Sequence, residues 1–183
     1  MLTKDNKNLD RAAEALLHSF SSCYDIYRIE PQEAGGQGKL PVTARCEFYE
    51  RSEKFVISRK AELWSANGEE FLYIIKVPQL TLELFERYRD QILEDGRSRI
   101  HIGPGHMYSY ITPVFLCNSC DEDARKALMK CRVYQSFKFS FHGWMDFHTA
   151  VIELSTGRID ANRSGREIKK NLKQIHKSWV KNT

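Results

Sequence analysis

Two histidines and an aspartate around a glycine are the residues best suited to acid–base chemistry. His142 and His148 flank Gly143 and Trp144, and Asp146 lies between them. Histidine can act as a base or as a ligand, but catalysis requires a partner within hydrogen-bond reach, which sequence separation cannot establish. Hairpin ends also carry His and Asp for reasons of turn geometry, so this cluster is one candidate catalytic site among others.

A Cys-x-x-Cys pair, Cys117 and Cys120, is the motif associated with redox and metal chemistry. Cys120 would begin a helix, whose dipole favours a thiolate, but the acidic residues 121–123 oppose that charge. A closed zinc site needs four ligands, usually two such pairs, and the sequence has one. We therefore expect structural thiols, no metal site and no cofactor, with redox and metal roles as the alternatives.

Four lysines repeat along one side of the expected C-terminal helix and could contact nucleic acid. Phosphate contacts add salt-dependent affinity, whereas lysines near a helix C-terminus are also favourable as an ordinary solvated face. We favour the solvated face, because the aromatic residues at 137, 139 and 141, which could stack on bases, alternate as a buried strand does. The candidate nucleic-acid-binding residues are Lys170, Lys173, Lys177 and Lys181.

Periodic apolar residues predict the first elements that must position these groups. Spacings of three and four residues indicate a helix over 9–21, and alternation indicates a strand over 42–49. Glycines without periodic apolar residues indicate a surface loop at 31–41. Thr81 can cap a second helix, which Gly96 would end in a left-handed conformation.

Asn67-Gly68 lies between two β-prone runs, residues 60–64 and 71–75. This dipeptide readily takes the positive φ angles of a type I′ turn, so the sequence predicts a β-hairpin centred on it. The register of such a hairpin would place Trp64 opposite Phe71. Because both faces of the hairpin are apolar, it should lie inside a sheet that is covered on both sides.

The second half of the chain predicts a strand, a helix, a hairpin and a last helix. The strand over 107–117 contains Pro113, which lacks a backbone donor and therefore places the strand at an edge or breaks it near its middle. A capping box at 119–122 would begin the third helix. Two strands near 137–141 and 147–154 would pair with each other.

These elements give a single α+β domain over residues 1–183, in the order α-β-β-β-α-β-α-β-β-α. Its mainly antiparallel sheet would have about six strands, with four helices packed on it. A chain of 183 residues can bury roughly 70% of its unfolded surface, so neither a disulfide nor a metal is needed for stability.

Cysteine usage and hydropathy predict the compartment. The five cysteines are odd in number and lack the regular spacing of a secreted disulfide scaffold, which favours reduced thiols. The N-terminus lacks an apolar signal core, and the longest aliphatic and aromatic run, 71–75, is far below the ~20 residues of a membrane span. We expect a soluble cytoplasmic protein without a membrane partner; nucleic acid is a partner that we do not favour.

The order of the elements resembles the core of restriction-endonuclease-like nucleases, in which a carboxylate on one strand and Glu-x-Lys on the next hold a divalent ion and position a water. Here Glu62 precedes the expected turn, and Glu70 and Lys76 follow it. Glu70 and Lys76 are six residues apart rather than two, which departs from that pattern. A metal-dependent nuclease, or another nucleic-acid-binding protein, is therefore the alternative function.

Five short motifs are spread over most of the chain: Arg51-Ser52-Glu53-Lys54-Phe55, Glu62-Leu63-Trp64, His106-Met107-Tyr108-Ser109-Tyr110, Gly143-Trp144, and the segment from Ser155-Thr156-Gly157 to Gly165-Arg166-Glu167. Together they resemble an uncharacterised prokaryotic family, a domain of unknown function. The resemblance implies a bacterial or archaeal cytosolic protein and brings no activity or catalytic residues. Since no nucleophile, base and orienting group occur at a recognisable spacing, the leading hypothesis is a non-catalytic binding or interaction domain, and whether the protein is an enzyme stays open.

Overall fold

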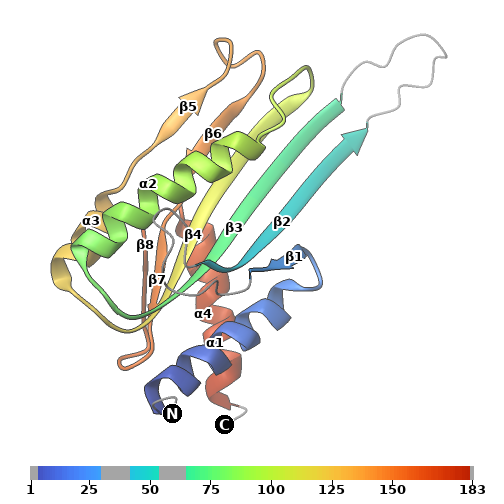
Figure 1. Cartoon of the computed structure of the whole chain (residues 1–183). Coiled ribbons are helices and arrows are strands. Elements are labelled where there is room, and N and C mark those ends of the chain that lie inside the picture. Colours follow the sequence, from blue (N-terminus) through green and yellow to red (C-terminus); the bar gives the residue numbers. More distant parts are fainter. Residues whose placement is uncertain (1–3, 30–41, 54–64, 182–183) are drawn as a thin grey trace.

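Eight strands form one mixed sheet, with four helices around it, in the part of the chain that the structure describes (Figure 1). The structure is a computed structural model, and it describes residues 4–29, 42–53 and 65–181. The predicted α+β class is confirmed. In chain order the elements are α1 (Lys4–Phe20), β1 (Asp25–Arg28), β2 (Val42–Glu53), β3 (Ser65–Leu80), α2 (Leu82–Arg99), β4 (His106–Cys120), α3 (Glu122–Lys130), β5 (Tyr134–Ser136), β6 (Trp144–Phe147), β7 (Ala150–Glu153), β8 (Arg158–Ala161) and α4 (Arg166–Lys181).

The sheet is mixed rather than mainly antiparallel, and it has more strands than the six expected. β1, β2 and β3 are antiparallel neighbours, whereas β4 lies parallel to β3. β6 and β7 also run parallel to β4, and β5 and β8 complete antiparallel hairpins with them. The parallel pairs arise because α2 and α3 carry the chain back across the sheet, as parallel neighbours require.

β4 is the central strand and changes partner at Pro113. Its residues 108–111 pair with β6, and its residues 114–117 pair with β7. The carbonyl of Ile111 accepts a hydrogen bond from the N–H of His148 on this side. Pro113 lies two residues further along β4, so its backbone nitrogen is on the same side of the strand. This nitrogen has no hydrogen to donate, and it faces the break between β6 and β7. The predicted edge position is wrong; the interruption is in the neighbouring strands.

The Asn67-Gly68 dipeptide lies inside β3 and is not a turn. Gly68 pairs with Glu50 of β2 and with Tyr108 of β4. A Cβ atom on Gly68 would lie 2.3 Å from Cζ of Tyr108, so this glycine makes room for an aromatic ring that crosses it. The predicted hairpin turn is therefore wrong, and the run 60–64 that it would have paired lies outside the described residues.

Two further local predictions are wrong. α2 continues beyond Gly96, because that residue is buried against Ile111 and does not turn the chain. β4 extends further than expected, so Ser119 lies in the strand, and Asp121 occupies the N-cap position of α3 without a side-chain cap bond. The predicted cap of α2 is confirmed, since the side chain of Thr81 accepts from the N–H of Leu84.

The aromatic residues at 137, 139 and 141 do not form a strand. Lys138, Phe139 and Ser140 take positive φ angles and turn the chain between β5 and β6. Phe137 is buried, whereas Phe139 and Phe141 are exposed. The expectation that all three alternate as a core face is therefore wrong, and the hairpin of this region is formed by β5 and β6.

Two apolar cores lie on opposite faces of the sheet. α2 and α3 pack on one face, over alternate residues that include Phe71 and Phe115. α1 and α4 pack on the other face, over the intervening residues, which include Leu72 and Val114. None of the described helices combines the length and the apolar character that are needed to span a membrane.

Helix cover differs between the two ends of the sheet (Figure 1). We call the end at which β4 begins and β2 ends the upper half, and the opposite end the lower half. α2 reaches into the upper half along its face, whereas α1 and α4 both lie at the lower half. The upper half is therefore covered by a described helix on one face only.

Candidate functional site

A row of side chains crosses the upper half on the face that no described helix covers. Leu72 and Val114 face the core under α1 and α4, so the even-numbered residues that precede them on β3 and β4 share that face. Glu70 is paired with Tyr110, and Tyr110 is paired with Asp146. These three side chains therefore lie next to each other across β3, β4 and β6.

Four aromatic rings run along the same face. Tyr108 and Tyr110 stack with their centroids 4.7 Å apart, Trp144 lies 6.5 Å from Tyr108, and His148 lies 4.6 Å from Tyr110. Tyr108 crosses β3, and its hydroxyl donates to Glu50 of β2 at 2.9 Å. We call the following seven residues the open face: Glu50, Glu70, Tyr108, Tyr110, Trp144, Asp146 and His148.

Two of the three carboxylates of the open face receive hydrogen bonds from neutral groups. Glu50 accepts from Tyr108, and Glu70 accepts from the hydroxyl of Tyr24 at 2.6 Å. Asp146 lies 3.9 Å from Nε2 of His148. Among the described side chains, no lysine or arginine forms an ion pair with these three carboxylates, so their charge is not balanced within the face.

The rings of the open face are neutral at physiological pH. Burial lowers the pKa of His148 and outweighs the opposite effect of Asp146, so the imidazole supplies no positive charge at pH 7. Burial and the neighbouring Glu70 and Asp146 raise the pKa of Tyr110. Burial and the hydrogen bond to Glu50 likewise raise the pKa of Tyr108. The charge of this surface therefore comes from its carboxylates.

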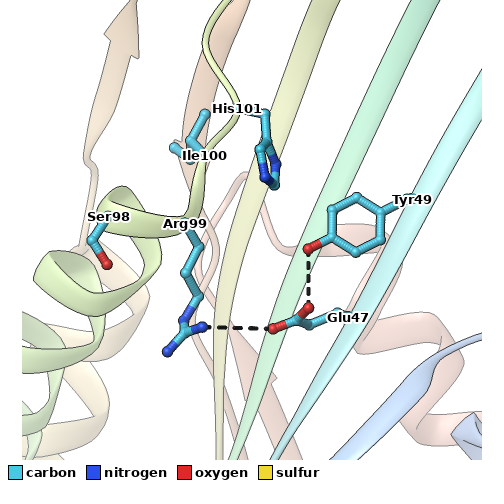
Figure 2. A pocket seen from close by; sticks show the side chains of 6 residues that line it. All are labelled: Glu47, Tyr49, Ser98, Arg99, Ile100 and His101. Carbon is cyan, nitrogen blue, oxygen red and sulfur yellow. Dashed lines mark hydrogen bonds and ion pairs between the residues drawn. The ribbon is translucent and has the colours of Figure 1, made fainter.

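A hollow of about 420 Å³ lies on the opposite face of the upper half, at the C-terminal end of α2. Figure 2 shows Glu47 and Tyr49 of β2 facing Arg99 and His101 across it. Glu47 accepts from the hydroxyl of Tyr49 at 2.9 Å and from Nε of Arg45 at 2.5 Å, and Nη1 of Arg99 lies 3.9 Å away. Burial and the bond to Glu47 raise the pKa of Tyr49 to about 12. Ser98 and Ile100 complete the lining.

A buried polar chain lies beside this hollow. Glu69 is 4% exposed and accepts from the backbone N–H of His101 at 3.3 Å and from the hydroxyl of Ser109 at 3.0 Å. Nδ1 of His101 lies 2.7 Å from the same carboxylate. Nε2 of His106 lies 2.7 Å from Ser109, and its Nδ1 lies 2.6 Å from the carbonyl of His142. The chain thus connects β3 with the turn between β5 and β6.

The hydrogen bonds of this chain restrict which of its atoms can donate. Nδ1 of His106 must donate, because a carbonyl only accepts. Ser109 has one hydroxyl proton; if it donates to Glu69, then Nε2 of His106 must donate to Ser109, and if it donates to His106, then Glu69 must carry a proton. In both cases the side chains form one continuous hydrogen-bonded chain from Glu69 through Ser109 and His106 to the carbonyl of His142.

Three of the catalytic candidates predicted from the sequence lie together. Glu70, Asp146 and His148 share the open face, although Glu70 was assigned to a different hypothesis from the other two. His142 lies in the turn between β5 and β6, where its carbonyl accepts from His106. It therefore does not join the cluster in which the sequence placed it.

The nuclease candidates do not come together. Lys76 lies further along β3, and its ammonium group contacts Asp10 of α1 at 2.5 Å. Glu70 instead accepts from Tyr24. Glu62 lies outside the described residues. No group of three His, Cys, Asp or Glu side chains in the described ranges is arranged to hold a metal ion.

The lysines of α4 lie apart from the exposed phenylalanines. Lys170, Lys173 and Lys177 are exposed, and Lys170 pairs with Glu167 at 2.7 Å. Lys181 is the last residue of α4, and its side chain lies outside the described part. α4 lies at the lower half of the sheet, whereas the turn between β5 and β6 is at the upper end (Figure 1).

Cys117 and Cys120 are buried free thiols at the end of β4. The N–H of Cys120 donates to Glu153, whose carboxylate also accepts from the guanidinium of Arg125 at 2.6 Å. Arg125 is itself buried and pairs with Asp160 at 2.8 Å. The two thiols therefore border an ion-pair cluster that joins α3 to β7 and β8, and their structural role remains a prediction.

Sequence reasoning missed the aromatic half of the open face. The signal was available in the alternation of Tyr108, Tyr110 and Thr112 with apolar or small residues at the start of an otherwise buried strand. Trp144 follows a glycine directly, and it was treated as a neighbour of histidines rather than as a surface ring. Glu50 lies one residue beyond the strand predicted over 42–49, and β2 continues through it to Glu53.

A family model described as Domain of unknown function (DUF8052) matches residues 8–174. This match agrees with the resemblance to a domain of unknown function that the sequence motifs indicated. Neither the curated proteins nor the solved structures include a significant match to the chain.

Proposed function

We propose that this chain, which belongs to the DUF8052 family of domains of unknown function, is a non-catalytic binding or interaction domain whose ligand carries an ammonium or guanidinium group. The observation that carries the proposal is the open face, where three carboxylates and four rings lie together without a described cationic partner. Cytoplasmic location and a bacterial or archaeal origin remain parts of this proposal.

The chemistry of the open face favours a cation. An ammonium or guanidinium group over the face of an aromatic ring is stabilised by about 0.5–1 kcal/mol at an exposed site, and by more when it is desolvated. Trp144, Tyr108 and Tyr110 supply such ring faces, and Glu70 and Asp146 lie on either side of Tyr110. An anion would meet carboxylates instead, so the face selects for positive charge.

The extent of the open face suggests a ligand longer than a single ion. The ring centroids from Trp144 through Tyr108 and Tyr110 to His148 are separated in turn by 6.5, 4.7 and 4.6 Å. A segment of a partner chain with several lysines or arginines would contact more than one ring and more than one carboxylate. We therefore assign the site to a basic peptide segment rather than to an isolated amine.

A fluorescence titration tests this proposal. A short oligoarginine peptide is added to the full chain, and the tryptophan emission is followed, with Trp144→Phe identifying the contribution of Trp144. We expect saturable binding that weakens as salt is added, and no binding of an oligoglutamate peptide. Equal responses to the two peptides, or no response to oligoarginine, would contradict the proposal.

Carboxylate variants locate the site in the same titration. Glu50→Gln and Asp146→Asn should each weaken oligoarginine binding by about two- to fivefold, as expected for one exposed ion pair. The matched control is Glu167→Gln, which removes an exposed carboxylate from α4, away from the open face. An equal loss of affinity in the control would show that the peptide responds to net charge only.

The alternative of a metal-dependent nuclease, or of another nucleic-acid-binding protein, has no specific observation in its favour. Its residues Glu70 and Lys76 have separate partners, Tyr24 and Asp10. Cleavage of DNA or RNA in Mg²⁺ or Mn²⁺ that is lost in Glu70→Gln would favour this alternative over a basic peptide.

A further inference from the structure

The turn between β5 and β6 presents two phenylalanine rings almost entirely to solvent. Phe139 is 96% exposed and Phe141 is 84% exposed. Large apolar side chains are usually at least half covered, and a pair of this kind at the end of a hairpin is unfavourable unless the pair meets a partner. Neither ring belongs to the open face or to the hollow.

The backbone holds these rings outward through a strained conformation. Lys138, Phe139 and Ser140 have φ angles of 46°, 54° and 69°, and residues other than glycine rarely adopt such values even singly. A strand conformation through the same residues would have returned Phe139 to the side of Phe137, which is buried. The left-handed conformation of three successive residues is therefore what exposes the rings.

The base of the turn is fixed, so the exposed rings do not belong to a loose loop. The N–H of Phe137 donates to the carbonyl of Gly143, and the N–H of His142 donates to the carbonyl of Phe137. His106 anchors the carbonyl of His142 from β4. Gly143 has a φ of 71°, and a Cβ atom there would lie 2.2 Å from the carbonyl oxygen of Met107, so no other residue fits this close approach.

A second loop lies beside this turn and also exposes side chains. The loop between α2 and β4, residues 100–105, ends at His106, which contacts the turn. It adds Ile102, which is 50% exposed, and His101, whose ring is exposed. We call the turn 137–143 and the loop 100–105 together the apex.

The charge of the apex has one sign. Neither of its segments contains an aspartate or a glutamate, the carboxylate of Glu69 that contacts His101 is buried, and Lys138 lies between Phe137 and Phe139. Apolar rings next to a lysine, without carboxylates, match the chemistry of an anionic lipid surface, where rings enter the boundary between headgroups and acyl chains and lysines meet the headgroups.

We propose that the apex is a membrane-contact element, with Phe139 and Phe141 inserting into the interfacial layer of an anionic bilayer and Lys138 contacting its headgroups. The contact is peripheral and needs no membrane-spanning helix, and it departs from the expectation, based on hydropathy, that the protein has no membrane partner. A bilayer fits the apex better than a protein pocket does, because a specific protein interface buries about 800 Å² on each partner inside a polar rim. The apex offers three apolar side chains on two loops.

Vesicle sedimentation tests the proposal on the full chain. The protein is mixed with phosphatidylcholine vesicles that contain or lack phosphatidylglycerol. We expect weak, reversible binding that is stronger on the anionic vesicles. Ser in place of both phenylalanines, Phe139→Ser with Phe141→Ser, should reduce the partition coefficient about tenfold or more, because two rings no longer leave water. Lys138→Glu should reduce binding about fivefold or more on the anionic vesicles only.

Matched controls distinguish insertion of the apex from nonspecific adsorption of exposed apolar side chains to vesicles. Met129→Ser removes a side chain that is exposed on α3, away from the apex, and it should bind like the unmodified protein. Phe139→Trp should give a blue shift of tryptophan emission on vesicle binding, whereas Met129→Trp should give none. All these variants change exposed side chains, so a folding defect detectable by circular dichroism is not expected.

Two results would overturn the proposal. One is the absence of binding to either kind of vesicle; the other is undiminished binding of the double serine variant. In the first case, the remaining alternative would be that Phe139 and Phe141 enter a pocket on a partner protein. Since the open face shares no residue with the apex, the oligoarginine titration is unaffected by either outcome.

Discussion

The carboxylates on the two faces of the upper half of the sheet have different hydrogen-bond partners. On the face under α2, Glu47 accepts hydrogen bonds from Arg45 and Tyr49, and Glu69 is linked through Ser109 to His106. On the open face, Glu70 and its neighbours receive bonds from neutral hydroxyls. The two environments are one residue apart on β3.

The difference follows from burial. A carboxylate that a helix covers loses its water and must be compensated inside the protein, or the fold is destabilised by several kcal/mol. A carboxylate on an uncovered sheet keeps part of its water, so it can stay unpaired and available to a ligand. A carboxylate that stabilises the fold can thus be distinguished from one that is available to a ligand by whether a group inside the protein compensates it.

The largest effect should separate the neighbouring residues Glu69 and Glu70. Glu69→Gln disrupts a buried hydrogen-bonded chain, because an amide cannot accept at both of the positions that face Ser109 and His101, and it should lower the free energy of unfolding by about 3 kcal/mol. Glu70→Gln should lower it by about 1 kcal/mol at most, since it weakens one hydrogen bond from Tyr24. Urea denaturation of both variants gives the comparison. Similar losses would mean that the two faces do not differ in this way.

A smaller effect is expected from Gly68→Ala, which tests the aromatic row. The new methyl group would overlap the ring of Tyr108, and overpacking of this kind lowers the free energy of unfolding by about 1–3 kcal/mol. Gly103→Ala is the control, because nothing lies within 4 Å of a Cβ atom there.

The cause of the Gly68→Ala effect can be isolated with a second substitution. If the clash is with the ring, adding Tyr108→Ala should remove most of the loss that the alanine at 68 produces, as a double-mutant cycle would reveal. Additive losses would indicate that Gly68 acts on the backbone of β3 instead.

The pH dependence of stability should report on the open face through His148. Its folded pKa is lowered from 6.5 by burial, so below pH 6.5 the unfolded chain binds a proton that the folded chain does not. The free energy of unfolding should therefore decrease as the pH is lowered, and this group contributes at most about 1.4 kcal/mol per pH unit. In His148→Gln the decrease between pH 7 and pH 5 should be smaller; an unchanged slope would assign it to other groups.

The smallest effect on stability is expected for Asp146→Asn. This carboxylate has no described lysine or arginine partner, and it lies near Glu70 across Tyr110. Its neutralisation should change the free energy of unfolding by about 0.5 kcal/mol or less, of either sign. Thermal and urea unfolding should agree on this value. A loss near that of Glu69→Gln would make Asp146 a structural charge.

Local periodicity was sufficient to place α1 and β2, because 3.6-residue and two-residue patterns depend only on which side is buried. The inward stripe of α1 and the strand β2 are examples. The hairpin prediction at Asn67-Gly68 was wrong because this dipeptide fits both a tight turn and a strand that an aromatic ring crosses. Only the position of Tyr108, on another strand, distinguishes these two structures.

The candidate site was predicted in part for the same reason. Glu70, Asp146 and His148 were selected by residue type, but the parallel pairing of β3, β4 and β6 brings them together, and no local pattern encodes that pairing. Phe139 and Phe141 continued an alternating pattern that the left-handed backbone ends. Long-range register and backbone strain are the two features that lay beyond the sequence.

The most direct test of the central claim is an NMR titration of the full chain with the oligoarginine peptide, following backbone amides and the indole N–H of Trp144. The account predicts shifts confined to β2, β3, β4 and β6 around Glu50, Glu70, Tyr110 and Asp146, with amides near Glu47 and His101 unchanged. Shifts centred on Glu47 and His101, or no shifts at all, would contradict it.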